Sequence, residues 1–184
     1  QYLCDTFKDT IDINKQNNDG YTAFMLAAKH NTNTKVIQYL YDTFKDTIDM
    51  NKQNNDGYTA FVLAVLNTSV NVIKYLYNTF KDTIDIDKQS NEAFMLAAWK
   101  NKDTDVIKNV YNILHEKIDI NKQNKDGNTA FMLAALNQNT HVIQYLYNKF
   151  KCTIDINTIL LNAAEKSKVA IVKSIYTAFE REID

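Results

Sequence analysis

The side chains of this 184-residue chain that could bind a metal or act in catalysis are three histidines, two cysteines and a recurring aspartate. Metal sites and catalytic triads need such groups to converge at one place in the fold. The histidines occupy three unrelated positions of the sequence repeat described below, and the cysteines lie four repeats apart. We therefore expect no metal site, no disulfide and no catalytic group from them. These residues are His30, His115, His141, Cys4 and Cys152.

An aspartate recurs once per repeat, at the start of an Asp-Ile-Asn triplet or a close variant of it. Carboxylates can serve as general acids and bases, but a residue that returns in every repeat is better explained as a structural turn or helix cap. Calcium binding is rejected, because placing Gly20 at position six of an EF-hand loop puts Lys15 at position one, where an acidic residue is needed. We expect neither an enzyme nor a cofactor. The aspartates are Asp12, Asp49, Asp85, Asp119 and Asp155.

The steps between those aspartates are 37, 36, 34 and 36 residues, which is the period of a two-helix repeat. All three glycines stand in the same string, Asp-Gly-(Tyr/Asn)-Thr-Ala-Phe. Both ends of the sequence lie inside a repeat, which indicates a piece of a longer array. We predict one domain, 1–184, with a partial repeat at 1–11, repeats at 12–48, 49–84, 85–118 and 119–154, and a degenerate or capping repeat at 155–184.

Each complete repeat predicts a turn and two helices. The Asp-Gly turn indicates a hairpin-like finger over 15–21, since glycine accepts a positive φ. Thr22 is the predicted N-cap of a short apolar helix over 23–28, and a longer amphipathic helix begins near Thr34. The third repeat lacks the Asp-Gly tip, and the fifth lacks the whole tip. Because a lone helix pair cannot bury its apolar faces, stacking of neighbouring repeats must supply the core.

These residues resemble the ankyrin repeat, whose signature is a glycine finger, Thr-Pro-Leu-His-x-Ala-Ala, Ile-Val-x-Leu-Leu and Gly-Ala-Asp-Val-Asn. The matching segments are 20–28, 36–40 and 48–51, and the next three repeats contain most of them again. The resemblance implies an all-α solenoid of stacked helix-turn-helix units with short hairpin fingers. The family's proline, histidine and Gly-Ala loop are all replaced here. Residues 43–47 fill the place of that loop, so we expect the second helix to be about one turn longer than usual.

Ankyrin repeat proteins usually bind through their finger tips and the exposed side of their short helices, which line a concave face. The resemblance therefore implies a protein or peptide partner. Alignment of this sequence with the family pattern implies the following finger-tip contacts with that partner: Asn18, Asp19, Tyr21, Asn55, Asp56, Tyr58, Lys125, Asp126 and Asn128. The implied contacts on the short helices are Lys29, His30, Leu66, Asn67, Trp99, Lys100, Leu136, Asn137, Glu165 and Lys166.

Trp99 is the only tryptophan, and it lies at the repeat position whose residue type varies most. With Leu66 and Leu136 on either side it would form an apolar strip, and exposed tryptophan and tyrosine are frequent binding hot spots. A second interpretation is that Trp99 only covers the space left by the shortened third finger. Both interpretations are consistent with the sequence.

Composition narrows the class of partner. The chain is 45% hydrophobic and 23% charged, and no apolar run has the length of a membrane span. A net charge of −1 disfavours nucleic acid, because a phosphate-binding face needs uncompensated positive charge. Unpaired cysteines are typical of a reducing compartment, so we expect an intracellular, cytoplasmic monomer. The absence of proline and the abundance of Asn, Lys and Ile are typical of AT-rich genomes, and a pathogen source would make a host protein the partner.

The leading functional hypothesis is a non-enzymatic scaffold for protein–protein interaction. Two alternatives stay open at this point, namely a targeting or regulatory arm of a larger enzyme and a structural tethering array. A tethering array should have similar residues at the repeat position that Trp99 occupies. In the five repeats this position is instead occupied by Lys29, Leu66, Trp99, Leu136 and Glu165.

Overall fold

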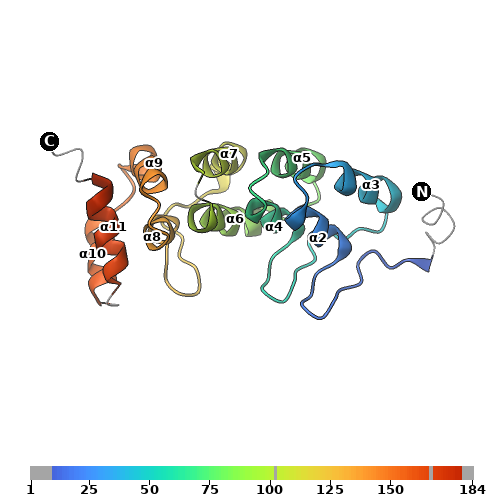
Figure 1. The fold of residues 1–184 in the computed structure, drawn as a ribbon, viewed down its shortest axis with the longest axis horizontal. Helices are drawn as coiled ribbons and strands as arrows, with labels where there is room; N and C mark the ends of the chain where they lie inside the picture. Colours follow the sequence, from blue (N-terminus) through green and yellow to red (C-terminus); the bar gives the residue numbers. More distant parts are fainter. Residues whose placement is uncertain (1–9, 102, 166–167, 180–184) are drawn as a thin grey trace. The chain divides into compact units, whose positions relative to one another are not determined.

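A computed structural model describes residues 10–101, 103–165 and 168–179 (Figure 1). Within these ranges the chain forms α-helices, one short 3-10 helix and loops, with no β-strand. The predicted all-α repeat architecture is confirmed. Residues 1–86 and 87–184 form two compact units. The repeat boundaries given above stay predictions.

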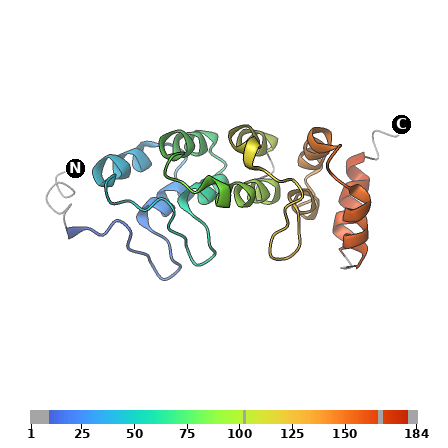
Figure 2. The ribbon, with the colours of Figure 1, turned by 180° about the vertical axis from the view of Figure 1, so that it is seen from behind.

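The first unit contains two complete helix pairs. Helix α2 (Ala23–His30) precedes α3 (Lys35–Phe44), and α4 (Ala60–Leu66) precedes α5 (Val70–Phe80). The short helices α2 and α4 pack against each other, and each also packs against the long helix that follows it. Figures 1 and 2 show the long helices in one layer, the short helices in a second layer, and two loops that extend from the short helices. These loops are the predicted fingers.

The second unit contains three helix pairs, of which the last is oriented differently. Helix α11 packs against α8, α9 and α10. In Figure 1, α10 and α11 stand upright beside each other, and their axes run across those of α8 and α9. The elements are α6 (Ile86–Lys100), α7 (Thr104–Leu114), the 3-10 helix η2 (His115–Lys117), α8 (Ala130–Leu136), α9 (Thr140–Phe150), α10 (Ile156–Glu165) and α11 (Val169–Phe179).

Each short helix that follows a finger is capped by a threonine, as predicted. The hydroxyl oxygen of Thr22 accepts a hydrogen bond from the backbone N–H of Met25 at 3.2 Å. Thr59 and Thr129 cap α4 and α8 in the same way, at 3.5 and 3.3 Å. These bonds satisfy an N–H group that has no partner inside the helix.

The phenylalanine two residues after the cap position is a buried core residue in four repeats, namely Phe24, Phe61, Phe94 and Phe131. Aromatic contacts join neighbouring repeats within each unit. The rings of Tyr41 and Phe80 meet edge to face with centroids 4.7 Å apart, and those of Phe94 and Phe150 do so at 6.2 Å. Stacking of repeats therefore builds the core, as the sequence predicted.

The recurring aspartate closes a turn, which confirms its structural interpretation. The carboxylate of Asp12 accepts a hydrogen bond from the N–H of Asn14 at 2.9 Å. The Asn14 amide then bridges the junction with the next repeat, donating to the Thr47 carbonyl at 2.6 Å and accepting from the Asp49 N–H at 2.9 Å. At the last aspartate, Asp155, the carboxylate instead accepts from the N–H and the hydroxyl of Thr158, at 3.2 and 2.6 Å.

The third repeat replaces its finger entirely with helix, which goes beyond the shortened finger that we expected. Helix α6 runs through 15 residues from Ile86, because no Asp-Gly pair interrupts it. Two of its side chains reproduce the bonds that Asn14 makes in the first repeat. Ser90 donates to the Lys117 carbonyl at 3.1 Å, and the Asn91 side-chain oxygen accepts from the Asp119 N–H at 2.9 Å.

The expected extra turn on the second helix is wrong. Helix α3 ends at Phe44, and the next residues form one tight turn instead. The N–H groups of Thr47 and Ile48 both donate to the Phe44 carbonyl, at 2.9 and 3.1 Å. The Thr47 hydroxyl donates to the same oxygen at 3.0 Å. Three donors therefore satisfy the Phe44 carbonyl, which is one of the carbonyl groups that the end of a helix leaves without an intrahelical partner.

Candidate partner-binding surface

The two fingers of the first unit are bonded to each other. The Asn55 N–H donates to the Asp19 carbonyl at 3.2 Å, and the Asn55 side chain donates to the Asn18 carbonyl at 3.0 Å. Gly20 lies at this contact with a φ of 81°. A Cβ atom on Gly20 would be 2.5 Å from the Asn55 side-chain oxygen, so glycine is needed for both its backbone angle and its small size.

The tips of these fingers are exposed and their tyrosines are half-buried. Tyr21 is held by Lys29, whose ammonium nitrogen lies 4.5 Å from the ring centroid and donates to the phenol oxygen at 3.0 Å. This contact links the first finger to α2. His30, one residue further along α2, is exposed. The exposed tip residues are Asn18, Asp19, Asn55 and Asp56, and Tyr21 and Tyr58 are the half-buried ones.

Asn67 joins two short helices and is not presented freely to solvent. Its amide nitrogen donates to the carbonyls of Ala28, at 2.8 Å, and Asn31. Helix α4 is one residue shorter than α2, so Asn67 corresponds to Asn31 and not to His30. The signal for this role was in the sequence, because an asparagine ends the short helix in each of the first four repeats. Leu66, just before it, is half-buried.

Trp99 is exposed on α6 in the second unit. Its side chain is 38% exposed, although Ala97 and Ala98 just before it are fully buried. The Lys100 ammonium nitrogen lies 3.5 Å from the centroid of the Trp99 ring, which is a close cation–π contact. Leu136 and Asn137, at the end of α8, are half-buried.

The finger of the second unit has an exposed tip and a buried base. Lys125 and Asp126 are exposed, but Asn128 is only 5% exposed. The Asn128 side-chain oxygen accepts a hydrogen bond of 2.5 Å from the ammonium of Lys168, which fixes the finger to the last helix pair. Of the remaining predicted residues, the Glu165 side chain and Lys166 lie outside the described residues.

Glu92 occupies the repeat position of the capping threonines, within α6. Its carboxyl is half-buried, and burial raises its pKa, while the nearby ammonium of Lys125 opposes that shift. Helix α6 continues through this position, so no cap is needed there. Glu92 instead contributes charge beside the exposed finger tip.

The structure does not bring together the residues that could bind a metal or act in catalysis. The three histidines are exposed. Among the described residues, no three His, Cys, Asp or Glu side chains are placed to hold one metal ion. Cys152 is an exposed free thiol, and Cys4 lies outside the described residues. No described helix combines the length and the apolar character that crossing a membrane requires.

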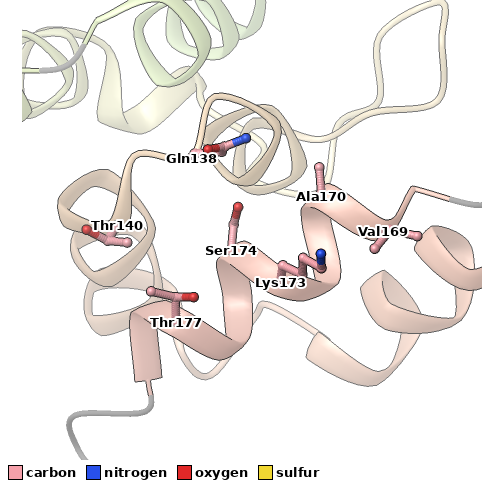
Figure 3. A pocket seen from close by; sticks show the side chains of 7 residues that line it. All are labelled: Gln138, Thr140, Val169, Ala170, Lys173, Ser174 and Thr177. Atoms are coloured by element: carbon pink, nitrogen blue, oxygen red, sulfur yellow. The ribbon is translucent and has the colours of Figure 1, made fainter.

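A cleft of about 510 Å³ lies between α11 and the segment that joins α8 to α9. Figure 3 shows its lining residues, five of which come from α11. This cleft was not predicted from the sequence. Its lining consists of Gln138, Thr140, Val169, Ala170, Lys173, Ser174 and Thr177.

Helix pairs that recur at a fixed period, begin at a threonine cap and share buried aromatic positions define a helical-repeat protein. The family model of ankyrin repeats (three copies) matches residues 1–90 and 94–184. The chain therefore belongs to the ankyrin repeat family, whose members generally mediate protein–protein interaction and are generally non-enzymatic.

A solved structure that shares the fold matches nearly the whole chain. It is described as the predatory endopeptidase Bd0816 from Bdellovibrio bacteriovorus in complex with the immunity protein Bd3460. The matched chain is 26% identical to this one, with a TM-score of 0.65, and the alignment covers 96% of this chain and 89% of that one. A comparison with curated proteins found no match.

Proposed function

We propose that this protein is a scaffold that binds a protein or peptide partner through its finger tips and short helices, on the concave face that the family resemblance implies. Family membership supports a protein partner. The similar solved structure is itself a complex between two proteins. The net charge of −1 favours such a partner over nucleic acid.

The exposed Trp99 carries this proposal. A tryptophan ring buries a large area when a partner covers it, and truncation of such a residue is frequently costly for binding. The Lys100 ammonium lies 3.5 Å from the ring centroid, and the Trp99 side chain is 38% exposed beside it. With Leu136 on α8, Trp99 supplies apolar contact area in the second unit.

The first unit would contribute polar contacts. Its exposed tip residues offer amide and carboxylate groups, and Tyr21 is oriented by Lys29 at the base of the finger. We leave Asn67 and Asn128 out of the proposed surface, because their side chains are bonded within the protein. The surface is then Asn18, Asp19, Tyr21, Lys29, His30, Asn55, Asp56, Tyr58, Leu66, Trp99, Lys100, Lys125, Asp126, Leu136 and Asn137.

Affinity capture followed by quantitative binding to the recovered partner tests this function. Trp99→Ala should weaken binding by about 2 kcal/mol or more, roughly thirtyfold, and leave the melting temperature nearly unchanged. Tyr176→Ala is the control, because Tyr176 is an exposed aromatic side chain on α11 that does not belong to the proposed surface.

Two outcomes would contradict the proposal. If the Trp99 variant recovered the same proteins at unchanged levels, Trp99 would not belong to the partner-binding surface. A large fall in melting temperature with binding retained would show instead that Trp99 fills the space of the missing third finger.

A further inference from the structure

The cleft between α11 and the α8–α9 segment is lined by hydrogen-bond donors without a compensating carboxylate. Its seven lining residues include one ammonium, three hydroxyls and one amide, but no aspartate or glutamate. Within the part of the chain that the structure describes, the Lys173 ammonium forms no ion pair and the Ser174 hydroxyl no hydrogen bond. Such a lining suits a negatively charged group.

Ser174 is the most informative of these residues. It is only 6% exposed, and its hydroxyl points into the cleft (Figure 3). The hydroxyl has no hydrogen-bond partner among the described residues, so it is available to an acceptor bound in the cleft. At the same repeat position the other long helices carry larger side chains, namely Tyr39, Tyr75, Asn109 and Tyr145. Serine at this position leaves room that a tyrosine ring would take.

Two helices begin at this cleft. Thr140 is the first residue of α9, and Val169 and Ala170 are the first residues of α11. Both helices have 11 residues, and the N-terminus of a helix carries a partial positive charge. In α9 the Asn139 side chain already accepts from the Val142 N–H at 3.2 Å, and in α11 the Ile171 N–H donates to the Lys168 carbonyl at 3.0 Å. Lys173 lies one turn further along α11. At the other end of α11, Gln144 of α9 donates to the Ala178 carbonyl at 2.8 Å and holds the helices together.

The geometry points to a binding site for the phosphoryl group of a phosphorylated compound in this cleft. A phosphoryl group offers at least three acceptor oxygens, and helix N-termini together with a lysine are a frequent means of binding it. A carboxylate would leave more of these donors without a partner. The cleft volume of about 510 Å³ also accommodates the group that carries the phosphate. None of the lining residues belongs to the proposed partner-binding surface, although Gln138 directly follows Asn137 of that surface.

Titration of the intact protein with inorganic phosphate, against sodium chloride at equal ionic strength, tests the site. We expect saturable amide chemical-shift changes confined to the residues around Thr140 and Ser174, with a rise in melting temperature. Lys173→Met should weaken phosphate binding roughly tenfold, because one charge-assisted hydrogen bond is lost. Lys74→Met is the matched control, since Lys74 is exposed at the same repeat position of α5, and it should leave phosphate binding unchanged.

Ser174→Tyr provides a second test, since it installs the residue of three other repeats. It should abolish phosphate binding while circular dichroism stays unchanged. O-phosphoserine and glycerol 3-phosphate distinguish a modified protein from a small metabolite as the source, and tighter binding of either supports the site. Equal responses to phosphate and chloride, equal effects of the Lys173 and Lys74 variants, or tighter binding of acetate than of phosphate would overturn it.

Discussion

Among the residues that the structure describes, two adopt the left-handed backbone conformation without being glycine. Thr68 and Gln138, which follow the C-caps of α4 and α8, have φ values of 58° and 56°. After α8, the Asn139 N–H donates to the Ala134 carbonyl at 3.3 Å, which is the wide hydrogen bond of a Schellman motif. Glycine is preferred at this position because a Cβ atom is strained there, and the β-branched Thr68 is strained most.

Replacing either residue with glycine should therefore stabilise the protein. We expect Thr68→Gly and Gln138→Gly each to raise the free energy of unfolding by about 1 kcal/mol, measured by urea denaturation. Thr32 holds the corresponding place after α2 without a positive φ, so Thr32→Gly serves as the control and should bring no gain. An equal gain for Thr32→Gly would contradict this explanation.

The roles of single residues were predictable where the bonding is local. The threonine caps and the aspartate turns follow from side-chain chemistry within three residues, and both were read correctly from the sequence. Asn67 and Asn128 were less predictable, because their partners Ala28 and Lys168 lie in other repeats. The positive φ at Thr68 could not be predicted from the residue type, since threonine is one of the least favoured residues in the left-handed conformation.

Among the structural elements, the fingers depend on their neighbours to different degrees. Gly20 and Gly57 occupy the same place in consecutive fingers, with φ values of 81° and 86°. An added Cβ atom at Gly20 would collide with the backbone and side chain of Asn55, whereas one at Gly57 would meet nothing within 4 Å. Substitution at Gly57 therefore measures the cost of backbone strain alone, and substitution at Gly20 measures that cost together with the loss of packing between the fingers.

Gly57→Ala should lower the free energy of unfolding by about 1 kcal/mol, which is the cost of placing alanine at a positive φ. Gly20→Ala should cost at least about twice as much, because the second finger must also move. Thermal and urea denaturation of the two variants provide the measurement. Equal losses would show that contact between the fingers contributes little to stability.

Helix α6 shows how far an element can be predicted from its motif. The missing Asp-Gly pair indicated the loss of the third finger, and that loss is observed. The replacement of the finger by a continuous helix was not predicted, because residues 86–92 carry no apolar period of their own. The new roles of Ser90 and Asn91 depend on where that helix places them, so the sequence alone could not indicate them.

For the molecule as a whole, burial is decided by the neighbouring repeat more than by residue type. Met132 on α8 and Leu161 on α10 hold the same repeat position, yet Met132 is 3% exposed and Leu161 is 70% exposed. Val172 of α11 is likewise 39% exposed, although its counterpart Ile143 is fully buried. In a stacked array, each repeat buries one face of the repeat before it.

A matched pair of substitutions tests this dependence. Leu161→Gln should change the free energy of unfolding by no more than about 0.5 kcal/mol, because its side chain already meets solvent. Met132→Gln should cost about 3 kcal/mol or more, since it buries an amide in an apolar core. Chemical denaturation of both variants decides the matter, and a large loss for the Leu161 variant would mean that α10 is covered in solution.

The orientation of the last helix pair explains why the cleft at Ser174 could not be predicted. The repeat pattern predicts a regular stack, in which α11 would lie beside α9 as α5 lies relative to α3. Helix α11 instead contacts both α8 and α9, and the cleft runs along α11 from Val169 to Thr177. A sequence pattern gives the order of the helices but not a change in the direction of their axes.

The replacement of a finger by α6 has a consequence for engineering. The third repeat retains its junction with the fourth although its protruding loop is gone, so such a loop is an appendage and not a structural requirement. Residues 54–58 could then be exchanged for randomised loops, as in libraries of synthetic binders, provided that Asn51 keeps its bonds at the base. The exchange would lose the two bonds that Asn55 makes to the first finger.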